Sequence, residues 1–438
     1  MSRTSSNISR RWFLAGAGAA TAAFGLPCFV PGGVLSAPGQ PGANDRINLG
    51  IIGNGKMMNG SHLPHFLKMP EVQVVVVCDV DQTRREAAAA KAHEAYGNTD
   101  CRALVDYREI LSRDDIDAVA IATPDHWHGT IILHAAQAGK DIYCEKPLTN
   151  TILEAKRTMD GVKKSGVIFQ TGSQQRASDN FRYACELVRN GRIGKIKQVL
   201  VDVGGPSRPC DLPEEEMEPG LDWDRWLGPA PMRPYNSVLS PRGMHNHFPA
   251  WRHYREYGGG GMTDWGAHHF DIAQWGLGMD ESGPVEIIAP EDPSKGKGVR
   301  FLYAGGVELV HDGVGGVTFI GDEGEIFVNR GKLRSTPESI IKKPIGDDEI
   351  HLYRAPGDSH SGHREDWIQC VRQRKQPNCP VEIGARSVTV CLLGNLVYWH
   401  GRSLRWDPQK WEFPGDAEAN SWLDYPYPRR EGCELPTV

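Results

Sequence analysis

Short apolar runs alternate with helix-like segments over the first third of the chain. The apolar runs occupy residues 47–52, 72–78, 116–122 and 141–144. Runs of this length with few polar residues are typical of strands that are buried on both faces of a parallel sheet. The segments between them carry apolar residues at helical spacing, as in residues 84–95 and 126–138. The pattern predicts repeated strand–helix units and therefore an α/β protein.

The pattern changes after about residue 168. Short apolar strands separated by glycine-rich turns are expected at residues 196–203, 299–303, 307–310, 317–320 and 325–328. The last four of these predict an antiparallel meander. Two helical segments, 363–374 and 385–400, would pack on one face of the sheet and leave its other face open to a second subunit. We therefore expect a second domain, of α+β type with a largely antiparallel open-faced sheet, over residues 169–438.

A glycine turn follows the first apolar run. Gly53-Asn54-Gly55 leads into a helix that Ser61 is expected to cap, and the strand after it ends at Asp79. Strand, glycine turn, helix, strand and acid form the fingerprint of a dinucleotide-binding Rossmann domain, expected here over residues 46–168. Gly53 permits the tight turn, and Gly55 lets the backbone approach a pyrophosphate at the helix start. The third glycine of the fingerprint is replaced by Met58.

The residues after the second strand bear on the choice of cofactor. Asp79 would accept hydrogen bonds from the hydroxyls of the adenine ribose, which favours NAD. Arg84 and Arg85 are close enough in sequence to reach a 2′-phosphate, so NADP is a possible cofactor as well. We expect Gly53, Gly55, Asp79 and Arg84 to bind the nucleotide.

A lysine directly after the apolar run 141–144 is the first catalytic candidate. Lys146 would lie at the carboxyl edge of the parallel sheet, where such sheets bind their ligands. Farther along, Asp264 and His268 stand at i, i+4 spacing behind a glycine loop, which places both side chains on one helix face. Oxidation of an alcohol needs a base for the hydroxyl proton, a role for His268, and a group that stabilises charge on the oxygen, a role for Lys146.

Two other interpretations of these residues stay open. In the first, His268 is an ordinary helix histidine and Asp264 is its surface partner, because i, i+4 pairs are common. In the second, His245 and His247 join Asp264, His268 or Asp271 in a metal site, although no tight ligand spacing recurs. We expect no metal, and the nine cysteines beyond the N-terminal segment show no C-x-x-C spacing.

Composition narrows the class of protein. The chain is 39% hydrophobic and 24% charged, as expected of a globular protein, and its 438 residues suffice for two domains. The net charge of −6 provides no basic excess to neutralise phosphates. A nucleic-acid partner is therefore not expected.

The N-terminal segment has the composition of an export signal. The twin arginines Arg10 and Arg11 precede a Gly/Ala-rich run to Val30 and then a Pro/Gly-rich stretch. This arrangement is typical of a bacterial Tat signal, which with its leader would occupy residues 1–42. A membrane anchor is the alternative, but the run is short and Pro27 interrupts it. We therefore expect a periplasmic or otherwise exported protein that has no stable membrane span and carries its cofactor with it.

Taken together, the motifs resemble the glucose–fructose oxidoreductase, inositol dehydrogenase and rhizopine-catabolism (Gfo/Idh/MocA) family. The resemblance covers nearly all of the chain beyond the signal. It rests on the glycine turn, on Thr123-Pro124 with His128, on Glu145-Lys146-Pro147 and on residues 258–268. It implies NAD(P)-linked oxidation or reduction of a small carbohydrate by a homodimer or homotetramer.

The resemblance also implies roles for individual residues. Lys146, Asp264 and His268 match the catalytic set of the family. The positions near the nicotinamide are matched by Thr123, Pro124, His128 and Glu145. On the substrate side we expect Gln174, Gln175, Arg176, Trp251, Arg252 and His269.

Three functions follow from these observations. The main hypothesis is an exported dehydrogenase of sugars, cyclitols or glycosides that retains its nicotinamide cofactor. The second is an NAD-dependent glycosidase that oxidises a sugar transiently and then eliminates the glycosidic bond; that branch usually lacks the lysine of the Glu-Lys-Pro motif. The third is a non-catalytic exported sugar-binding protein, against which the intact Lys146, Asp264 and His268 count.

Overall fold

The computed structural model describes residues 41–357 and 359–437. The expected export signal, residues 1–42, lies almost entirely outside this range. The chain divides into two units after Arg46. The described part of the first unit holds one short 3-10 turn, Ala43–Asp45. All of the structure discussed below belongs to the second unit, residues 47–438.

A six-stranded parallel sheet follows, in the order β3-β2-β1-β4-β5-β6. Its strands are β1 (Ile47–Ile52), β2 (Val72–Cys78), β3 (Arg102–Leu104), β4 (Ala118–Ile121), β5 (Asp141–Cys144) and β6 (Phe169–Thr171). The strand order, with the first strand at the centre, is that of a Rossmann domain, as the apolar runs predicted. Because β6 begins at Phe169, the sheet includes one strand beyond the boundary expected at residue 168.

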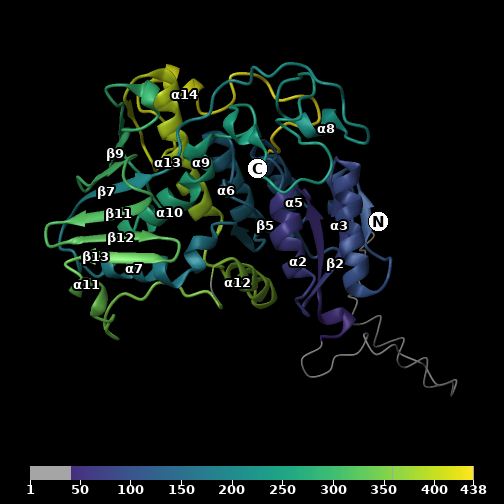
Figure 1. Cartoon of the computed structure of the whole chain (residues 1–438), viewed down its shortest axis with the longest axis horizontal. Coiled ribbons are helices and arrows are strands. Elements are labelled where there is room, and N and C mark those ends of the chain that lie inside the picture. The colour runs from purple at the N-terminus through teal and green to yellow at the C-terminus, as the bar shows by residue number, and fades with distance from the viewer. Residues whose placement is uncertain (1–40, 358, 438) are drawn as a thin grey trace, which may run out of the picture. The chain divides into compact units, whose positions relative to one another are not determined.

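Helices connect these strands (Figure 1). They are α2 (Leu63–Phe66), α3 (Gln82–Tyr96), α4 (Tyr107–Leu111), α5 (Asp125–Gln137) and α6 (Ile152–Ser165). Helix α6 begins with a capping box, in which Thr151 and Glu154 each accept a hydrogen bond from the other's backbone N–H, both at 3.1 Å. Both donors at this helix start are thereby satisfied.

The helix after the glycine turn starts earlier than the sequence predicted. It begins at Lys56, passes through a π-helical turn at Met58–His62 and continues into α2. Ser61 lies inside this helical run, so the prediction that Ser61 caps it was wrong. Met58 is fully buried among the apolar side chains of this domain, which explains why the helix is already formed at that position.

The second sheet has eight strands in the order β13-β12-β11-β7-β10-β9-β8-β14. They are β7 (Ile196–Asp202), β8 (Glu286–Ile288), β9 (Arg300–Leu302), β10 (Glu308–Val310), β11 (Gly316–Gly321), β12 (Glu325–Asn329), β13 (Lys332–Thr336) and β14 (Leu404–Arg405). The pairs are antiparallel except β10 with β7. The expected continuous meander is therefore wrong, because β7 lies between β10 and β11. Val199 and Val201 of β7 are fully buried, as a central position demands.

Helices cover one face of this sheet. Helix α10 (Gly266–Leu277) packs on the central strands β7 and β11, and α7 (Asp179–Arg189) packs on β12 and β13 at one edge. Helix α13 (Val381–His400) packs on α10 and α6. The remaining helices are α8 (Trp223–Leu227), α9 (Gly261–Asp264), α11 (Ser339–Lys342), α12 (Ser359–Gln373) and α14 (Ala417–Ser421).

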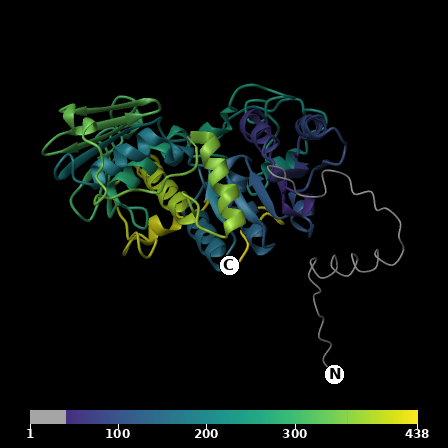
Figure 2. The same cartoon turned by 90° about the horizontal axis from the view of Figure 1, so that it is seen from below.

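Helix α12 does not cover the second sheet as predicted. Its buried residues Trp367, Ile368 and Val371 join the core of the Rossmann domain, where Trp367 contacts Phe66 and Tyr143. Both views of the chain place α12 between the two sheets (Figures 1 and 2). Its apolar face therefore fastens the C-terminal part of the chain to the nucleotide-binding domain.

Helix α13 is the one helix of the described residues that is long and apolar enough to cross a membrane. In the fold, 89% of that apolar window is buried inside the protein. A core helix passes the same test of length and composition, so this helix gives only weak evidence of a membrane span.

Candidate active site

The glycine turn opens onto a cavity of about 960 Å³ that has the composition of a dinucleotide site. Gly53 has φ +83°, and a Cβ there would lie 2.8 Å from backbone atoms of Ala122 and Thr123. Only glycine fits such a position. A Cβ at Gly55 would meet nothing within 4 Å, so the backbone there is open to a ligand. The cavity runs from Asp79 past the glycine turn to Thr123 and Pro124, as the fingerprint predicted.

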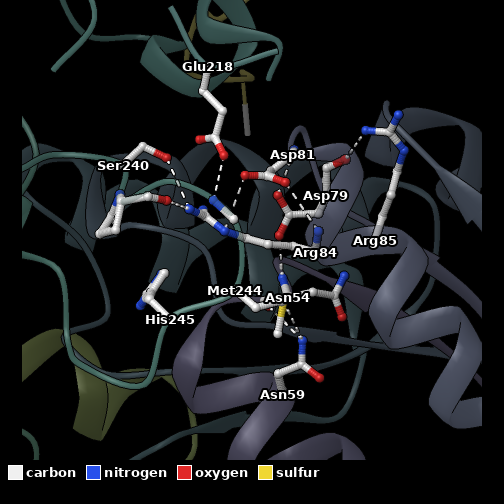
Figure 3. A network of polar contacts seen from close by, with 12 residues as sticks. Asn54, Asn59, Asp79, Asp81, Arg84, Arg85, Glu218, Ser240, Met244 and His245 are labelled. Atoms are coloured by element: carbon white, nitrogen blue, oxygen red, sulfur yellow. Dashed lines mark hydrogen bonds and ion pairs between the residues drawn. The ribbon is translucent and has the colours of Figure 1, made fainter. Parts of the chain in front are cut away.

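Asp79 lies at the end of β2 and is held by the turn itself (Figure 3). One carboxylate oxygen accepts the backbone N–H of Asn54 at 2.6 Å, and the other accepts that of Asp81 at 2.9 Å. Burial raises the pKa of Asp79, although the nearby charge of Arg84 opposes the shift. The two backbone bonds fix the carboxylate at the edge of the cavity, where it can accept hydrogen bonds from the hydroxyls of a ribose.

The Arg84 side chain contacts groups of both domains. Its guanidinium donates to the carbonyl of Pro241 at 2.5 Å and to the hydroxyl of Ser240 at 3.3 Å, and it lies 3.4 Å from Asp81 (Figure 3). The side chain still lines the cavity. A role on a 2′-phosphate would require Arg84 to leave these partners.

A segment of the second domain, residues 220–252, covers the cavity. The backbone of this segment bonds that of the Rossmann domain, from Gln82 to Gly220 and from Asp222 to Val80, both at 3.0 Å. Lys56 donates to the side chain and carbonyl of Asn246 at 2.7 and 2.6 Å. Trp226, Leu239, Phe248 and Trp251 line the cavity from this segment. A dinucleotide would thus be enclosed by two domains.

A second cavity, of about 750 Å³, adjoins the first. The two share Met57, Ala122, Thr123, Phe248 and Arg252 in their walls. Lys146 faces the second cavity and donates to Asp264 twice, at 2.8 Å to the carboxylate and 2.8 Å to the carbonyl. Arg252 lies 3.5 Å from the same carboxylate. The predicted lysine therefore stands where a nucleotide site and a second site meet.

Asp264 is paired with Lys146 and not with His268. Burial alone would raise the pKa of Asp264, but the charges of Lys146 and Arg252 hold it below its ordinary value. Asp264 ends α9 and His268 lies in α10, so the i, i+4 spacing spans a break at Trp265 rather than one continuous helix. The carboxylate stays ionised and fixes the lysine.

His268 lines the same cavity with a buried imidazole. Burial lowers its pKa well below the ordinary value, and the charges of Lys146 and Arg330 lower it further. Its Nδ1 is buried without a hydrogen-bond partner among the described residues. The ring is therefore neutral at physiological pH and free to accept a proton.

Glu145 is buried beside Lys146 and belongs to a chain of polar groups that the sequence did not reveal. His62 Nε2 lies 2.9 Å from the Glu145 carboxylate, and Arg364 donates to His62 Nδ1 at 3.0 Å. Because Nδ1 accepts from Arg364, Nε2 is the ring nitrogen that donates to Glu145. Burial would raise the pKa of Glu145, but the bond from His62 and the charges of nearby groups, Lys146 among them, together lower it to about 2. Arg364 lies on α12, so it reaches His62 because α12 packs against the Rossmann domain.

Thr123, Pro124 and His128 occupy the expected region in different ways. Thr123 and Pro124 line the nucleotide cavity. His128 is buried behind it, with Nδ1 2.8 Å from the carbonyl of Pro147 and Nε2 3.0 Å from that of Thr123. His128 thus connects the loop after β4 to the loop after β5 rather than facing the cavity.

The predicted substrate residues divide into two groups. Gln174 and Arg252 line the second cavity, and Trp251 lines the first. The Gln174 Oε1 atom is buried without a partner in the described chain, as a ligand-binding group would be.

Arg176, His269 and Gln175 line neither cavity. Arg176 is buried and holds Asp271 through two bonds of 2.8 and 2.9 Å, and it also pairs with Asp280 at 2.7 Å. His269 faces the carbonyl of Asp202 at 3.3 Å, away from the cavity. Arg176 is thus part of a buried ion-pair cluster. The substrate contacts of Arg176 and His269 stay a prediction.

Several cavity residues were missed by sequence reasoning. The second cavity is also lined by Met57, Asp125, Phe248, Trp265, Arg330 and His360. They come from separate stretches of the chain, so no local spacing joins them. His245 and His247, the candidates for a metal site, contact each other through a 2.9 Å bond from ring nitrogen to carbonyl. Among the described residues, no group of three or more His, Cys, Asp or Glu side chains has the arrangement of a metal site.

The family comparison agrees with this geometry. Residues 47–173 match an oxidoreductase family described by its NAD-binding Rossmann fold, and residues 207–431 match the C-terminal α/β domain of the same family, Gfo/Idh/MocA. The chain belongs to this oxidoreductase family. The match confirms the expected family, its fold class and NAD as the cofactor type of the first domain.

Individual relatives align with the chain over only part of their length. The chain is 33% identical over 155 residues to levoglucosan dehydrogenase of Pseudarthrobacter phenanthrenivorans, which is 34% of this chain and 39% of that protein. It is 28% identical over 163 residues to myo-inositol 2-dehydrogenase of Thermotoga maritima, covering 37% and 47%. The alignments thus span less than half the length of these relatives.

A solved structure resembles almost the whole fold. The WlbA dehydrogenase of Bordetella pertussis, solved with NADH and UDP-GlcNAcA, superposes with a TM-score of 0.57 at 19% identity. The match covers 84% of this chain and 99% of that one. At this identity the likeness establishes the common fold and leaves the substrate to other arguments.

Proposed function

We propose that this chain is an NAD(P)-dependent oxidoreductase that oxidises or reduces a hydroxyl group of a sugar, cyclitol or glycoside. The observation that carries the proposal is the position of Lys146. Its ammonium group is fixed by Asp264 in a cavity that shares walls with the nucleotide cavity. The dehydrogenases named among the relatives act on levoglucosan and myo-inositol, which supports a polyhydroxylated substrate.

The side chains of the second cavity suit alcohol oxidation. A bound nicotinamide would supply the acceptor for the hydride that leaves the carbon. Lys146 would hold the substrate oxygen and stabilise the negative charge that develops on it as its proton leaves. His268, kept neutral by burial, would take that proton. Asp264 acts on Lys146 by holding its amino group in place through two hydrogen bonds.

We also propose that the cofactor stays bound between turnovers. The bonds from Lys56 to Asn246 and from Arg84 to Pro241 support this, because they tie the covering segment to the edge of the nucleotide cavity. Release of a dinucleotide would require these bonds to open. Retention would also suit an exported enzyme, since nicotinamide cofactors are scarce outside the cytoplasm.

One experiment tests both the proposed reaction and the proposed retention of the cofactor. The protein is purified without added nucleotide and mixed with D-glucose, myo-inositol, levoglucosan or methyl β-D-glucopyranoside, and absorbance of the reduced nicotinamide is recorded. We expect reduction of a co-purified cofactor by at least one of these compounds. Product analysis separates simple oxidation from elimination, since elimination releases methanol from the glucoside without net reduction. A protein that neither carries nor binds a nicotinamide nucleotide would refute the proposal.

Export is proposed from the N-terminal sequence alone. The twin arginines Arg10 and Arg11 would direct the folded protein through the Tat route. Replacement of both by lysine should leave the protein in the cytoplasm of a Tat-competent host. Unchanged export of the double variant would contradict the assignment.

We propose that the uncovered face of the second sheet forms a homodimer or homotetramer contact. Half-buried Leu200, Leu302, Val310 and Ile320 alternate along the strands with fully buried neighbours and so point to this face. Polar side chains such as Gln198, Arg300 and Glu308 lie on the same face between them. An open sheet face that carries large apolar side chains is a candidate subunit contact. Light scattering on the purified protein should give a dimer or tetramer mass, and Ile320→Glu should reduce it to that of a monomer.

A further inference from the structure

Asp125 is a buried carboxyl group in the second cavity for which the mechanism above has no use. It is the first residue of α5, directly after Thr123-Pro124, and only 3% of the residue is exposed. Lys146, Arg252 and Asp264 line the same cavity. Asp125 therefore stands among the catalytic groups without belonging to their network of bonds.

The carboxyl group has no hydrogen-bond partner in the described part of the chain. Gly258 packs closely on one side of it, because a Cβ there would come within 3.2 Å of the Asp125 Oδ2 atom and 3.1 Å of the Arg252 backbone. Asp125 also lines the second cavity, so its carboxyl group is within reach of a molecule bound there. Polar groups in such positions are usually hydrogen-bonded to protein, water or ligand. An unpartnered carboxyl in the wall of a cavity is the arrangement expected of a group whose partner is a ligand.

The charges that face Asp125 come from separate stretches of the chain. Arg252 and Lys146 favour its ionised form, whereas Asp264 and Glu145 oppose it. Burial is the largest influence and raises the pKa of Asp125 well above the ordinary value. Burial therefore favours the neutral carboxylic acid, which can both donate and accept a hydrogen bond.

We propose that Asp125 binds a hydroxyl group of the substrate on a carbon next to the one whose oxygen Lys146 holds. This rests on the proposed function and specifies its substrate class. The substrate is a compound with hydroxyl groups on neighbouring carbons, as in a sugar or cyclitol, rather than an isolated secondary alcohol. A hydroxyl group is both a donor and an acceptor, and so is the neutral carboxyl that faces it.

The proposal predicts discrimination against deoxy compounds. A substrate without the neighbouring hydroxyl would leave the buried carboxyl unpaired, and sites built to bond a hydroxyl reject such analogues by roughly 10²- to 10⁴-fold in kcat/KM. For the compound that reduces the cofactor best, the parent and its monodeoxy analogues are compared. We expect the wild type to reject one analogue, deoxygenated beside the reacting carbon, by at least roughly 100-fold.

The variant Asp125→Ala should lose that discrimination. Its preference for the parent over the same analogue should fall to within about tenfold, while its preferences at the other ring positions stay as in the wild type. Asp160→Asn is the control, because Asp160 lies on α6 with Lys156 as its partner, outside both cavities. An unchanged preference at every position would overturn the proposal and leave the proposed function intact. A wild type that oxidises none of the compounds would instead refute the proposed function.

A second measurement does not depend on turnover or on the alanine variant. The carbonyl stretch of a protonated carboxyl is separate from that of a carboxylate, so infrared spectra at neutral pH report the state of Asp125. We expect a protonated-carboxyl band in the wild type that Asp125→Asn lacks. Identical spectra of the two proteins in this region would overturn the assignment of Asp125 as a hydrogen-bond donor.

Discussion

Lys146 and Asp264 are 118 residues apart in the sequence, yet the lysine Nζ lies 2.8 Å from both the carboxylate and the carbonyl oxygen of Asp264. One partner follows a strand of the Rossmann sheet, and the other ends a short helix of the second domain. The pair thus joins the two domains at the place where their cavities meet. The position of Lys146, the proposed catalytic group, therefore depends on correct packing of both domains.

Loss of the lysine should stop the chemistry while nucleotide binding continues. Lys146→Ala removes the group that stabilises charge on the substrate oxygen, so kcat should fall by roughly 10²- to 10³-fold. Stopped-flow absorbance measures reduction of the bound cofactor, and fluorescence titration measures nucleotide affinity. Lys156→Ala is the matched control, because Lys156 pairs with Asp160 on the surface of α6. A rate unaffected by Lys146→Ala would exclude the lysine from the mechanism.

The pH dependence should lack the inflection of an ordinary histidine. Burial, with the charges of Lys146 and Arg330, lowers the pKa of His268 well below 6.5. The imidazole is then neutral, and able to accept a proton, on both sides of pH 6.5. A plot of kcat/KM against pH should be flat there and should decline only at lower pH. An inflection near 6.5 that His268→Asn abolishes would show that the ring is not buried as described.

Glu145 should make stability sensitive to acid. Burial opposes its ionisation, but the hydrogen bond from His62 and the charges of nearby groups, Lys146 among them, together outweigh burial and lower the folded-state pKa to about 2 from an ordinary value of 4.5. The carboxylate therefore contributes stability that is complete above pH 4.5 and is lost as the pH falls toward 2. The contribution is on the order of 1–3 kcal/mol.

Denaturant unfolding at pH 7 and pH 3 measures this contribution. Glu145→Gln should be less stable than the wild type at pH 7, and the difference should shrink at pH 3. Glu382→Gln, whose carboxylate is partly exposed on α13, serves as the control. Equal differences at the two pH values would contradict the assigned role of His62.

The two glycines near the turn should differ in their tolerance of a side chain. Gly53→Ala places a Cβ 2.8 Å from the backbone of Ala122 and Thr123 at a φ of +83°, so it should destabilise the protein by about 1–3 kcal/mol. Gly60→Ala, with nothing within 4 Å of its Cβ, should leave stability within about 1 kcal/mol of the wild type. Thermal unfolding compares the two. Equal melting temperatures for both variants would argue against a strained, tightly enclosed backbone at Gly53.

NAD should bind more tightly than NADP. Asp79 is fixed at the cavity edge by Asn54 and Asp81, and Arg84 is engaged by Pro241, which leaves a 2′-phosphate beside a carboxylate. We expect a preference for NADH over NADPH of about tenfold or more, which Asp79→Ala reduces. Fluorescence titration of nucleotide-free protein measures both affinities. Equal affinity in the wild type would indicate that Arg84 leaves its protein partners when NADP binds.

Much of the first domain could be predicted because its signals are local. The apolar runs that form β1, β2, β4 and β5 are continuous in sequence. The glycine turn follows β1, and polar residues that line the cavities follow the other three: Asp79, Thr123 and Lys146. Lys146 and Asp79 were found in this way, since the carboxyl ends of parallel strands share one edge. The helix boundary at Ser61 was missed because Met58, which reads as a departure from the fingerprint, is already part of the buried helix face.

The wrong predictions concern which elements pack against each other, and not where the elements lie in the sequence. Strands β9 to β12 lie close to where they were expected, but β7 enters between β10 and β11. Helix α12 was expected on the second sheet and packs into the Rossmann core. Strand and helix periodicity identifies which face is apolar, and it does not identify which apolar surface covers it.

The sequence by itself determined the elements, the nucleotide fingerprint and the three residues Lys146, Asp264 and His268, because strand, turn and helix patterns are carried by residues near one another in the chain. Only the tertiary structure decided how these residues pair. It joined Asp264 to Lys146 instead of His268, set His62 and Arg364 behind Glu145, and left Asp125 unpartnered in the cavity. These relationships depend on packing between distant segments, and burial then sets the charge of each group.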